Sequence, residues 1–486
     1  MPPAILTLIE SDCEAEVGNA FVAIAAEYMA QTRSRDGRVS TLHTPAGLAA
    51  RFNEPMPRTG RPIPAIVRRV RADIIPDCNH LFHPRYVGHQ VSAALPVPVW
   101  MEVVTAALNQ SAAVFEMSPV GTVLEHRVVQ WMCELVGFAA GASGTLTTGG
   151  TEASFTGLLA ARAAVLPDAW TVGVGSDPPV LLCGEHAHYA VTRAAGELGI
   201  GMKNVLPIRS RDYKLDPDAL RQALEALGRS GKRIMAVVAT AGSTATGSFD
   251  DLDAIATLCD EHGVWLHVDG AHGASALLSR THRHRVDGIE RARSIAWDPH
   301  KMMLMPLQCG LVLMRYERDL DAAFSQRAPY LFHERQAGGD EERSWDQGTR
   351  SFMCSRRADV FKLWVTLQRY GADSLGELYD HLCATTRAFW EMVSDHAEFE
   401  AMHQPESNIL CFRYVGDRSL SDEQLDEINR EVRERYNRSG EGWITSTSLD
   451  GRRVLRVTIM NPRTTLADVR AVLDGLWVTA RQLKSS

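Results

Sequence analysis

The pattern of apolar and polar positions changes character along the chain. The first 75 residues or so have the amphipathic periodicity of helices, from which we expect a helical arm. This pattern breaks at a proline cluster that is typical of an irregular connector, formed by Pro55, Pro57, Pro62 and Pro64. The stretch from Val97 to Phe138 is again largely helical, with apolar residues repeating on one face.

From about residue 145 to 315, short apolar runs alternate with helical segments. Four runs have the composition of buried strands, at 180–183, 234–238, 264–268 and 311–314. Between them, Asp216-Pro217 begins a helix that Gly228 should close, and Asp251 begins another that Gly263 should end. Alternation of strand and helix favours a mainly parallel sheet covered by helices.

The C-terminal part has a different order of elements. Two strand candidates, at 408–414 and 453–459, are each followed by a helical pattern, which predicts a small α+β domain. We therefore expect three parts: an N-terminal helical arm of residues 1–95, a large α/β domain of residues 96–390, and a small C-terminal α+β domain of residues 391–486.

Composition narrows the class of protein. The chain of 486 residues is 45% hydrophobic, carries a formal net charge of -8, and has only a short basic run around residues 282–285, so nucleic acid is not an expected partner. No two of the nine cysteines form a Cys-x-x-Cys pair. Acidic residues appear early, and the apolar stretch at 20–30 is short and contains Glu27. We expect a cytoplasmic chain with no secretory signal, membrane span or metal site.

Two segments of the chain are candidates for ligand binding. The segment Thr147–Ser154 is a small, polar, glycine-containing turn that opens a helix, where unpaired N–H groups and the helix dipole suit a phosphate, although the segment is also consistent with a plain helix cap. Asp269 ends an apolar strand, at the edge where open α/β sheets bind ligands. It is also consistent with an acid that caps the next turn.

Two further features carry reactive side chains. Lys301 precedes Met302, Met303, Leu304 and Met305, so its amine should be partly desolvated and a usable nucleophile. A lysine that extends its ammonium to solvent from a helix end is the alternative. His188 follows the strand at 180–183, where an imidazole can stack on a ring and donate a proton, or simply form hydrogen bonds within a loop.

These four features, taken together and in this order along the chain, resemble the motifs of a known enzyme family. From about His83 to Leu363 the chain resembles the group II pyridoxal-phosphate decarboxylases, which include glutamate, cysteine-sulfinate, aromatic-amino-acid and 2,4-diaminobutyrate decarboxylases. The matching stretches are HPRYVGHQVSAALP, TTGGTEAS, HAHYAVTRA, ATAGSTATGSFD, WLHVDGAHG and WDPHKMMLMPLQCG. The run that ends in WDPHKMM is most similar to the glutamate and cysteine-sulfinate branch, and the first and fourth stretches to the bacterial diaminobutyrate branch.

The resemblance implies a fold and a site. The fold is the fold type I of pyridoxal-phosphate-dependent transferases, with a mainly parallel seven-stranded sheet in the large domain and active sites at the boundary of a homodimer. Lys301 would hold the cofactor as a Schiff base, Asp269 would pair with its ring nitrogen, and His188 would stack on the ring. The other implied contacts are Gly150, Thr151 and His300 to the phosphate, Thr244 and Ala271 to the ring, and His89, Gln90 and Arg456 to the substrate.

The implied reaction is the decarboxylation of an L-amino acid, preferably polar or acidic, through an external aldimine and a quinonoid. The chain departs from the family at two places. The segment HERQAGGDEER at 333–343 lacks the tyrosine by which family members protonate the product carbon, so His333, His188 or a partner residue would have to act. Asp298 stands where glutamate decarboxylase has asparagine.

Three other functions stay open. A decarboxylating aldehyde synthase or oxidative deaminase on the same fold would consume oxygen and release ammonia. A protein that binds the cofactor without catalysis would not need Lys301, Asp269 and His188 together. A fold type I aminotransferase fits the His300-Lys301 pair and the His188 motif less well than a decarboxylase does.

Overall fold

The structure is a computed structural model that describes residues 4–41, 43–91, 93–324, 345–416 and 419–484. The chain forms two compact units: one comprises Met1–His89, Ala388–Met402 and Cys411–Ser486, and the other comprises Gln90–Arg387 and His403–Leu410. The residues expected to form the arm and the small domain thus contribute to one unit. The three-part division of the chain stays a prediction.

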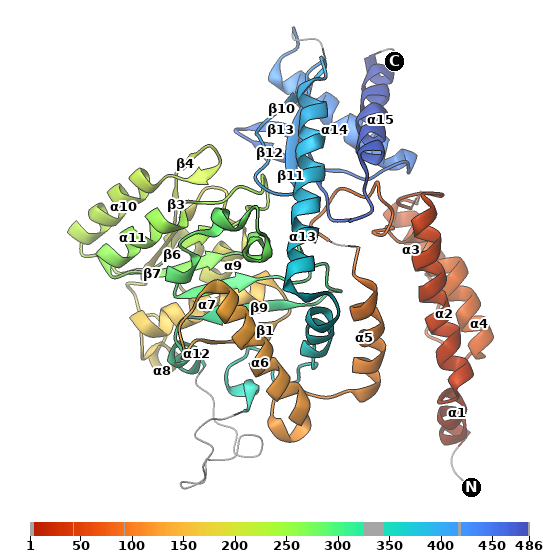
Figure 1. The fold of residues 1–486 in the computed structure, drawn as a ribbon, viewed down its shortest axis with the longest axis horizontal. Coiled ribbons are helices and arrows are strands. Elements are labelled where there is room, and N and C mark those ends of the chain that lie inside the picture. Colours follow the sequence, from red (N-terminus) through yellow and green to blue (C-terminus); the bar gives the residue numbers. More distant parts are fainter. Residues whose placement is uncertain (1–3, 42, 92, 325–344, 417–418, 485–486) are drawn as a thin grey trace. The chain divides into compact units, whose positions relative to one another are not determined.

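A seven-stranded sheet organises the larger unit, in the order β1-β9-β8-β7-β6-β2-β3 (Figure 1). Its strands are β1 (Ser143–Thr147), β2 (Val180–Gly184), β3 (Val205–Ile208), β6 (Ile234–Thr240), β7 (Trp265–Asp269), β8 (Ser294–Trp297) and β9 (Gly310–Met314). Neighbours from β8 to β3 pair in parallel, whereas β9 is antiparallel to both β1 and β8. This confirms the predicted mainly parallel sheet, and a hairpin of β4 (Ser210–Arg211) and β5 (Lys214–Leu215) lies outside it.

Helices accompany these strands. They are α5 (Pro96–Leu108), α6 (Pro119–Val136), α7 (Gly150–Val165), α8 (Ala169–Val172), α9 (Ala190–Glu197), α10 (Pro217–Arg229), α11 (Leu252–His262), α12 (Glu317–Ala323) and α13 (Val360–Ser394), which is interrupted at Gly371. Asp216 and Asp251 cap α10 and α11 through their carboxylates, and Gly263 ends α11 with a φ of 63°. Gly228 does not end its helix as expected, because α10 continues through it to Arg229.

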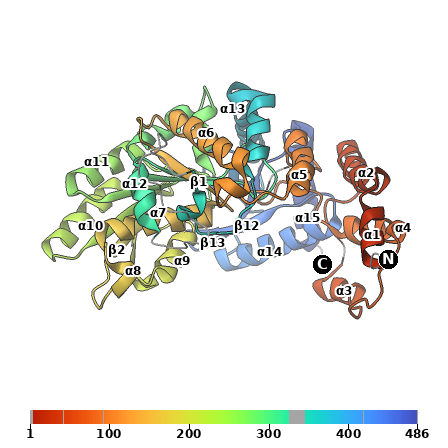
Figure 2. The same cartoon turned by 90° about the horizontal axis from the view of Figure 1, so that it is seen from below.

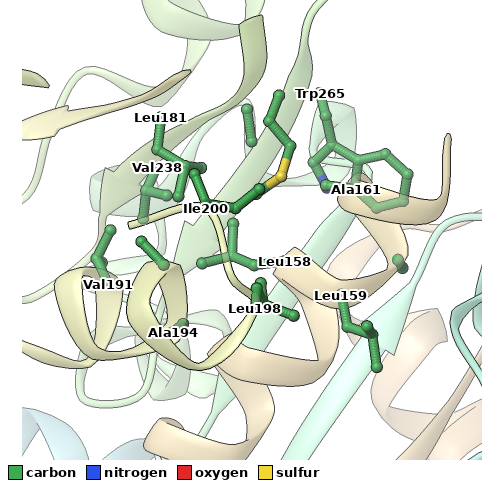
Figure 3. Close-up of a cluster of buried hydrophobic side chains, with 14 of the residues drawn as sticks. Leu158, Leu159, Ala161, Leu181, Val191, Ala194, Leu198, Ile200, Val238 and Trp265 are labelled. Carbon is green, nitrogen blue, oxygen red and sulfur yellow. The ribbon is translucent and has the colours of Figure 1, made fainter. Parts of the chain in front are cut away.

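The core beside the large sheet explains the position of α7. Leu158, Leu159 and Ala161 of this helix pack with apolar residues of α9 and of strands β2, β6 and β7 (Figure 3). Val237 lies between two core residues of β6, so its side chain points to the opposite face. Because α11 contacts β6 and β7, helices cover both faces of the sheet (Figure 2).

The other unit contains the N-terminal helices and most of a four-stranded sheet of order β10-β11-β13-β12. Its elements are α1 (Ala4–Asp12), α2 (Ala15–Gln31), α3 (Pro45–Arg51), α4 (Ile63–Arg69), β10 (Phe399–Ala401), β11 (Ile409–Tyr414), α14 (Asp422–Ser439), β12 (Thr445–Leu449), β13 (Arg452–Thr458) and α15 (Leu466–Lys484). Within the described ranges, no helix is long and apolar enough to cross a membrane.

Candidate active site

A cavity of about 450 Å³ opens at the carboxyl ends of five strands of the large sheet. Strands β1, β2, β6, β7 and β8 end at this edge, and the residues after them supply most of the cavity wall. Open α/β sheets bind ligands at such an edge. The lining residues are Thr148, Gly149, Gly150, Thr151, His188, Thr240, Gly242, Thr244, Asp269, Ala271, His272, Asp298, His300, Lys301, Leu307 and Gln308.

The turn from β1 into α7 forms one wall of this cavity, and its two glycines have no room for side chains. Gly149 caps the helix with a φ of 154°, and a Cβ on Gly150 would lie 2.7 Å from the Cβ of Ala271. The carboxylate of Glu152 accepts hydrogen bonds from both the N–H and the hydroxyl of Thr148, at 2.8 and 2.7 Å, which fixes the loop. The first N–H groups of α7 have no intrahelical partner, so this wall can hold an anion.

Lys301 enters the cavity from the turn after β8. Its Nζ lies 3.1 Å from Oδ2 of Asp298, and its side chain is 20% exposed. The four residues that follow it are buried, and the N–H of Leu95 donates to the carbonyl oxygen of Leu304 at 2.8 Å. The apolar packing of this turn fixes the backbone of Lys301 and leaves its amine inside the cavity.

Asp269 ends β7 in the same wall and is buried. Its Oδ1 accepts the N–H of Ala271 at 3.2 Å, which orients the carboxylate after the strand. Two residues earlier, His267 is fully buried beside Ser294, with 2.8 Å between Nδ1 and the serine Oγ. Burial lowers the pKa of His267 to about 4, and the charge of Asp269 opposes that change.

Two histidines of the cavity each accept a backbone hydrogen bond on Nδ1. Nδ1 of His188 accepts the N–H of Ala190 at 3.3 Å, and Nδ1 of His300 accepts the N–H of Cys309 at 3.1 Å. When these rings are neutral, the hydrogen is therefore on Nε2. Burial lowers the pKa of both imidazoles, against the opposing effect of Asp269 on His188 and of Asp298 on His300.

The structure brings together all eight residues that the sequence indicates for the cofactor, since each lines this cavity. The predicted substrate contacts are not among the lining residues: His89 and Arg456 belong to the smaller unit, and Gln90 is the first residue of the larger one. Burial lowers the pKa of His89, and the charges of Arg456 and Arg433 act in the same direction. His333 and the segment around it lie outside the described residues.

Several lining residues were not identified from the sequence. Thr240 and Gly242 follow the strand predicted at 234–238, so the position at a strand end was an available signal. His272 follows Asp269 by three residues, and its Nε2 lies 2.6 Å from Oδ1 of Asn408. Gln308 reaches the wall where the chain turns back into β9, and no sequence pattern indicates this.

The chain belongs to the family described as the pyridoxal-dependent decarboxylase conserved domain, whose model matches residues 45–415. It is 33% identical over 433 residues to L-2,4-diaminobutyrate decarboxylase of Rhizobium meliloti, a match that covers 89% of this chain and 85% of the relative. It is 33% identical over 405 residues to cysteine sulfinic acid decarboxylase of Rattus norvegicus, covering 81% of each.

Solved structures agree with this assignment. Mouse CSAD superposes with a TM-score of 0.89 at 28% identity and 99% coverage of both chains. The glutamate decarboxylase domain of the diaminobutyrate-pyruvate transaminase and L-2,4-diaminobutyrate decarboxylase from Vibrio parahaemolyticus has a TM-score of 0.85 at 27% identity and 96% coverage of both. The chain is therefore a carboxy-lyase with the fold type I architecture that uses pyridoxal 5'-phosphate to decarboxylate an amino acid.

The cavity fits this cofactor. It combines a lysine amine for an aldehyde, a glycine-lined helix terminus for a phosphate, and a carboxylate that can hold a protonated ring nitrogen. One feature opposes the fit, because the buried carboxylate of Asp298 lies at the same helix terminus.

Proposed function

We propose that this enzyme removes the α-carboxylate of an L-amino acid with a polar or acidic side chain, giving the amine and carbon dioxide, with Lys301 as the residue that binds the cofactor. The observation that carries the assignment is the position of Lys301 in one cavity with Asp269 and the glycine turn. Among the described residues that line the cavity, Lys301 is the only lysine.

Each residue of the cavity has a distinct task in this proposal. The N–H groups at the start of α7, with Thr151 and His300, bind the phosphate. Thr244 and Ala271 pack against the ring. The carboxylate of Asp269 keeps a proton on the ring nitrogen, which its burial and its fixed orientation make effective. When bound, pyridoxal phosphate supplies a conjugated ring that takes up the electron pair left by carbon dioxide.

His188 is placed to handle the substrate and its proton. Because its Nδ1 accepts a backbone N–H, the Nε2–H is the group available to the cavity. From there it donates a hydrogen bond to the α-carboxylate. After carbon dioxide has left, the same hydrogen is available to the substrate carbon, where the sequence of residues 333–343 supplies no tyrosine.

The substrate preference rests on two observations. The relatives named above act on a diamino acid and on a sulfinic acid. In the smaller unit, Arg456 is buried on β13 and acts electrostatically on His89, which makes the pair suitable for a side-chain carboxylate or sulfinate. We propose that both contact the substrate, together with Gln90.

A second candidate function follows from the absence of tyrosine in residues 333–343. Slow protonation of the product carbon would leave it open to oxygen, so that aldehyde and ammonia are formed as in an aldehyde synthase or oxidative deaminase. Purified, cofactor-loaded enzyme should be incubated with glutamate, aspartate, cysteine sulfinate, 2,4-diaminobutyrate and aromatic amino acids while oxygen is monitored. Amine without oxygen uptake supports the decarboxylase, and aldehyde with oxygen consumption supports the second function.

We further propose a homodimer in the cytoplasm with active sites at the subunit boundary. Large apolar side chains are exposed along α5 and α6, including Val103, Leu108 and Val120, and a second subunit would cover such a face. No disulfide joins any of the nine cysteines, all of which lie in the described part of the chain, as in a reducing compartment. Light scattering at two protein concentrations gives the mass, and a monomer at both would contradict the dimer.

A further inference from the structure

Asp298 is a buried acid in the middle of the proposed cofactor site. Its exposed fraction is 1%, and its Oδ2 lies 3.1 Å from Nζ of Lys301 and 3.4 Å from Nε2 of His300. Its Oδ1 is buried and has no hydrogen-bond partner among the residues that the structure describes. Oδ2 is thus paired with the positive charge of Lys301, whereas Oδ1 has no such partner among the described residues.

Both oxygens of this carboxylate face the glycine turn. A Cβ on Gly150 would lie 3.0 Å from Oδ2 of Asp298, and a Cβ on Gly149 would lie 3.9 Å from Oδ1. The carboxylate therefore lies next to the glycine turn in which α7 begins, and the N-terminus of this helix is where a bound anion is stabilised. A phosphate held by these N–H groups would lie next to a second negative charge inside the protein.

We propose that Asp298 is a positioning residue that pairs with Lys301 in the cofactor-free enzyme and opposes the phosphate in the loaded enzyme, so that it weakens cofactor retention and makes the cofactor exchangeable. This inference rests on the proposed roles of Lys301 and the glycine turn. In this proposal the side chain of Asp298 sets the equilibrium between the cofactor-loaded and the cofactor-free enzyme.

The pairing changes when Lys301 binds the cofactor. The nitrogen of the ammonium joins the aldehyde carbon, the aldehyde oxygen leaves as water with two of the ammonium hydrogens, and one hydrogen at most remains on Nζ. Nζ can then donate at most one hydrogen to Asp298, where the ammonium carried three. His300 lies near the same carboxylate oxygen, with Nε2 at 3.4 Å, and burial lowers the pKa of this imidazole.

Asp298→Asn keeps the shape of the side chain and removes its charge. The variant lacks the ion pair that stabilises the unloaded state and lacks the repulsion that destabilises the loaded state, so both changes strengthen binding. Two like charges within about 5 Å inside a protein repel strongly enough that we expect the dissociation constant of pyridoxal phosphate to fall by about tenfold or more.

The experiment titrates cofactor-free protein with pyridoxal phosphate, followed by tryptophan fluorescence and by the visible absorbance of bound cofactor, and then measures release after dilution. Asp319→Asn is the matched control, because Asp319 is also buried and pairs with Arg293 at 2.7 Å but lies outside the cavity. Asp298→Ser is a second neutral variant. Both Asp298 variants should bind more tightly and release more slowly, and the control should match the unsubstituted enzyme.

Each outcome decides the inference. If the unsubstituted enzyme binds the cofactor and the Asp298 variants bind it equally or more weakly, the inference is wrong and the proposed function stands. If the unsubstituted enzyme binds no cofactor, the proposed function and the inference both fail. Thermal unfolding adds a second readout: the cofactor should raise the melting temperature of Asp298→Asn by more than it raises that of the control.

Discussion

Replacing His267 tests the electrostatics beneath the active site. This imidazole has no exposed surface, and it lies on β7 two residues before Asp269. Burial lowers its pKa from 6.5 to about 4. The folded chain therefore keeps His267 neutral over a pH range in which the unfolded chain binds a proton. His267→Gln removes this titration and keeps a group that can bond to Ser294.

The sign and size of the effect follow from these two pKa values. The stability that neutral His267 provides is present above pH 6.5 and is lost as the pH falls towards 4. At about pH 5, roughly 1.5 units below 6.5, the loss is about 2 kcal/mol relative to neutral pH. For a unit of roughly 300 residues this is about 3 °C in melting temperature.

Asp250, in the same unit, changes the stability of the fold with pH in the opposite direction. Burial raises its pKa to about 6, so the folded chain binds a proton there before the unfolded chain does, and this stabilises the fold as the pH falls from 6. The total pH dependence is therefore a sum, and only the difference between the unsubstituted protein and His267→Gln isolates the histidine.

The assay is thermal unfolding of both proteins at about pH 7.5 and about pH 5. Lowering the pH should reduce the melting temperature of the unsubstituted protein by about 3 °C relative to His267→Gln. His262→Gln is the control, since His262 is exposed at the end of α11, and it should follow the unsubstituted protein. Parallel curves for the unsubstituted protein and His267→Gln would refute the argument from burial.

Three further substitutions test other parts of the structure. Arg356→Met leaves Glu125, which is 1% exposed, without the guanidinium at 2.7 Å and should cost about 3–5 kcal/mol of stability, so an unchanged melting temperature would contradict the buried pair. Asp269→Asn should keep bound cofactor, seen by its absorbance, and lower kcat by about 100-fold or more, whereas full activity would remove its proposed role. Arg456→Met should raise KM for an acidic substrate by about tenfold with a smaller effect on kcat, and an unchanged KM would show that Arg456 does not bind the substrate.

Sequence patterns predict the strands that consist of long apolar runs. The four strands predicted between residues 145 and 315 correspond to β2, β6, β7 and β9, and the two predicted in the C-terminal part correspond to β11 and β13. The strand β1 was not identified because its residues, Ser143–Thr147, are mostly small or polar although all are buried. The strand β8 has only four residues, and β3 contains Pro207, so neither has a clear periodic pattern. Burial by tertiary packing, which the sequence does not display, decides these cases.

The cofactor side of the site was predicted from its motifs and from the family resemblance, and the fold explains why these motifs meet. Its residues follow strands that end at one edge of a parallel sheet, so neighbouring segments of chain carry them to the same place. Contacts between segments that are far apart in the sequence leave no comparable pattern in the sequence. Glu125 and Arg356 are 231 positions apart, and only the fold shows that they form a buried pair behind β1.

The most direct test of the account is to locate the cofactor on the chain. The enzyme should be loaded with pyridoxal phosphate, reduced with borohydride to fix the cofactor on its lysine, digested, and mapped by mass spectrometry. We predict that the added mass lies on the peptide containing Lys301. Labelling of another lysine, such as the buried Lys362 that pairs with Glu102 and Asp359, or no labelling at all, would contradict the assignment of this cavity as the active site.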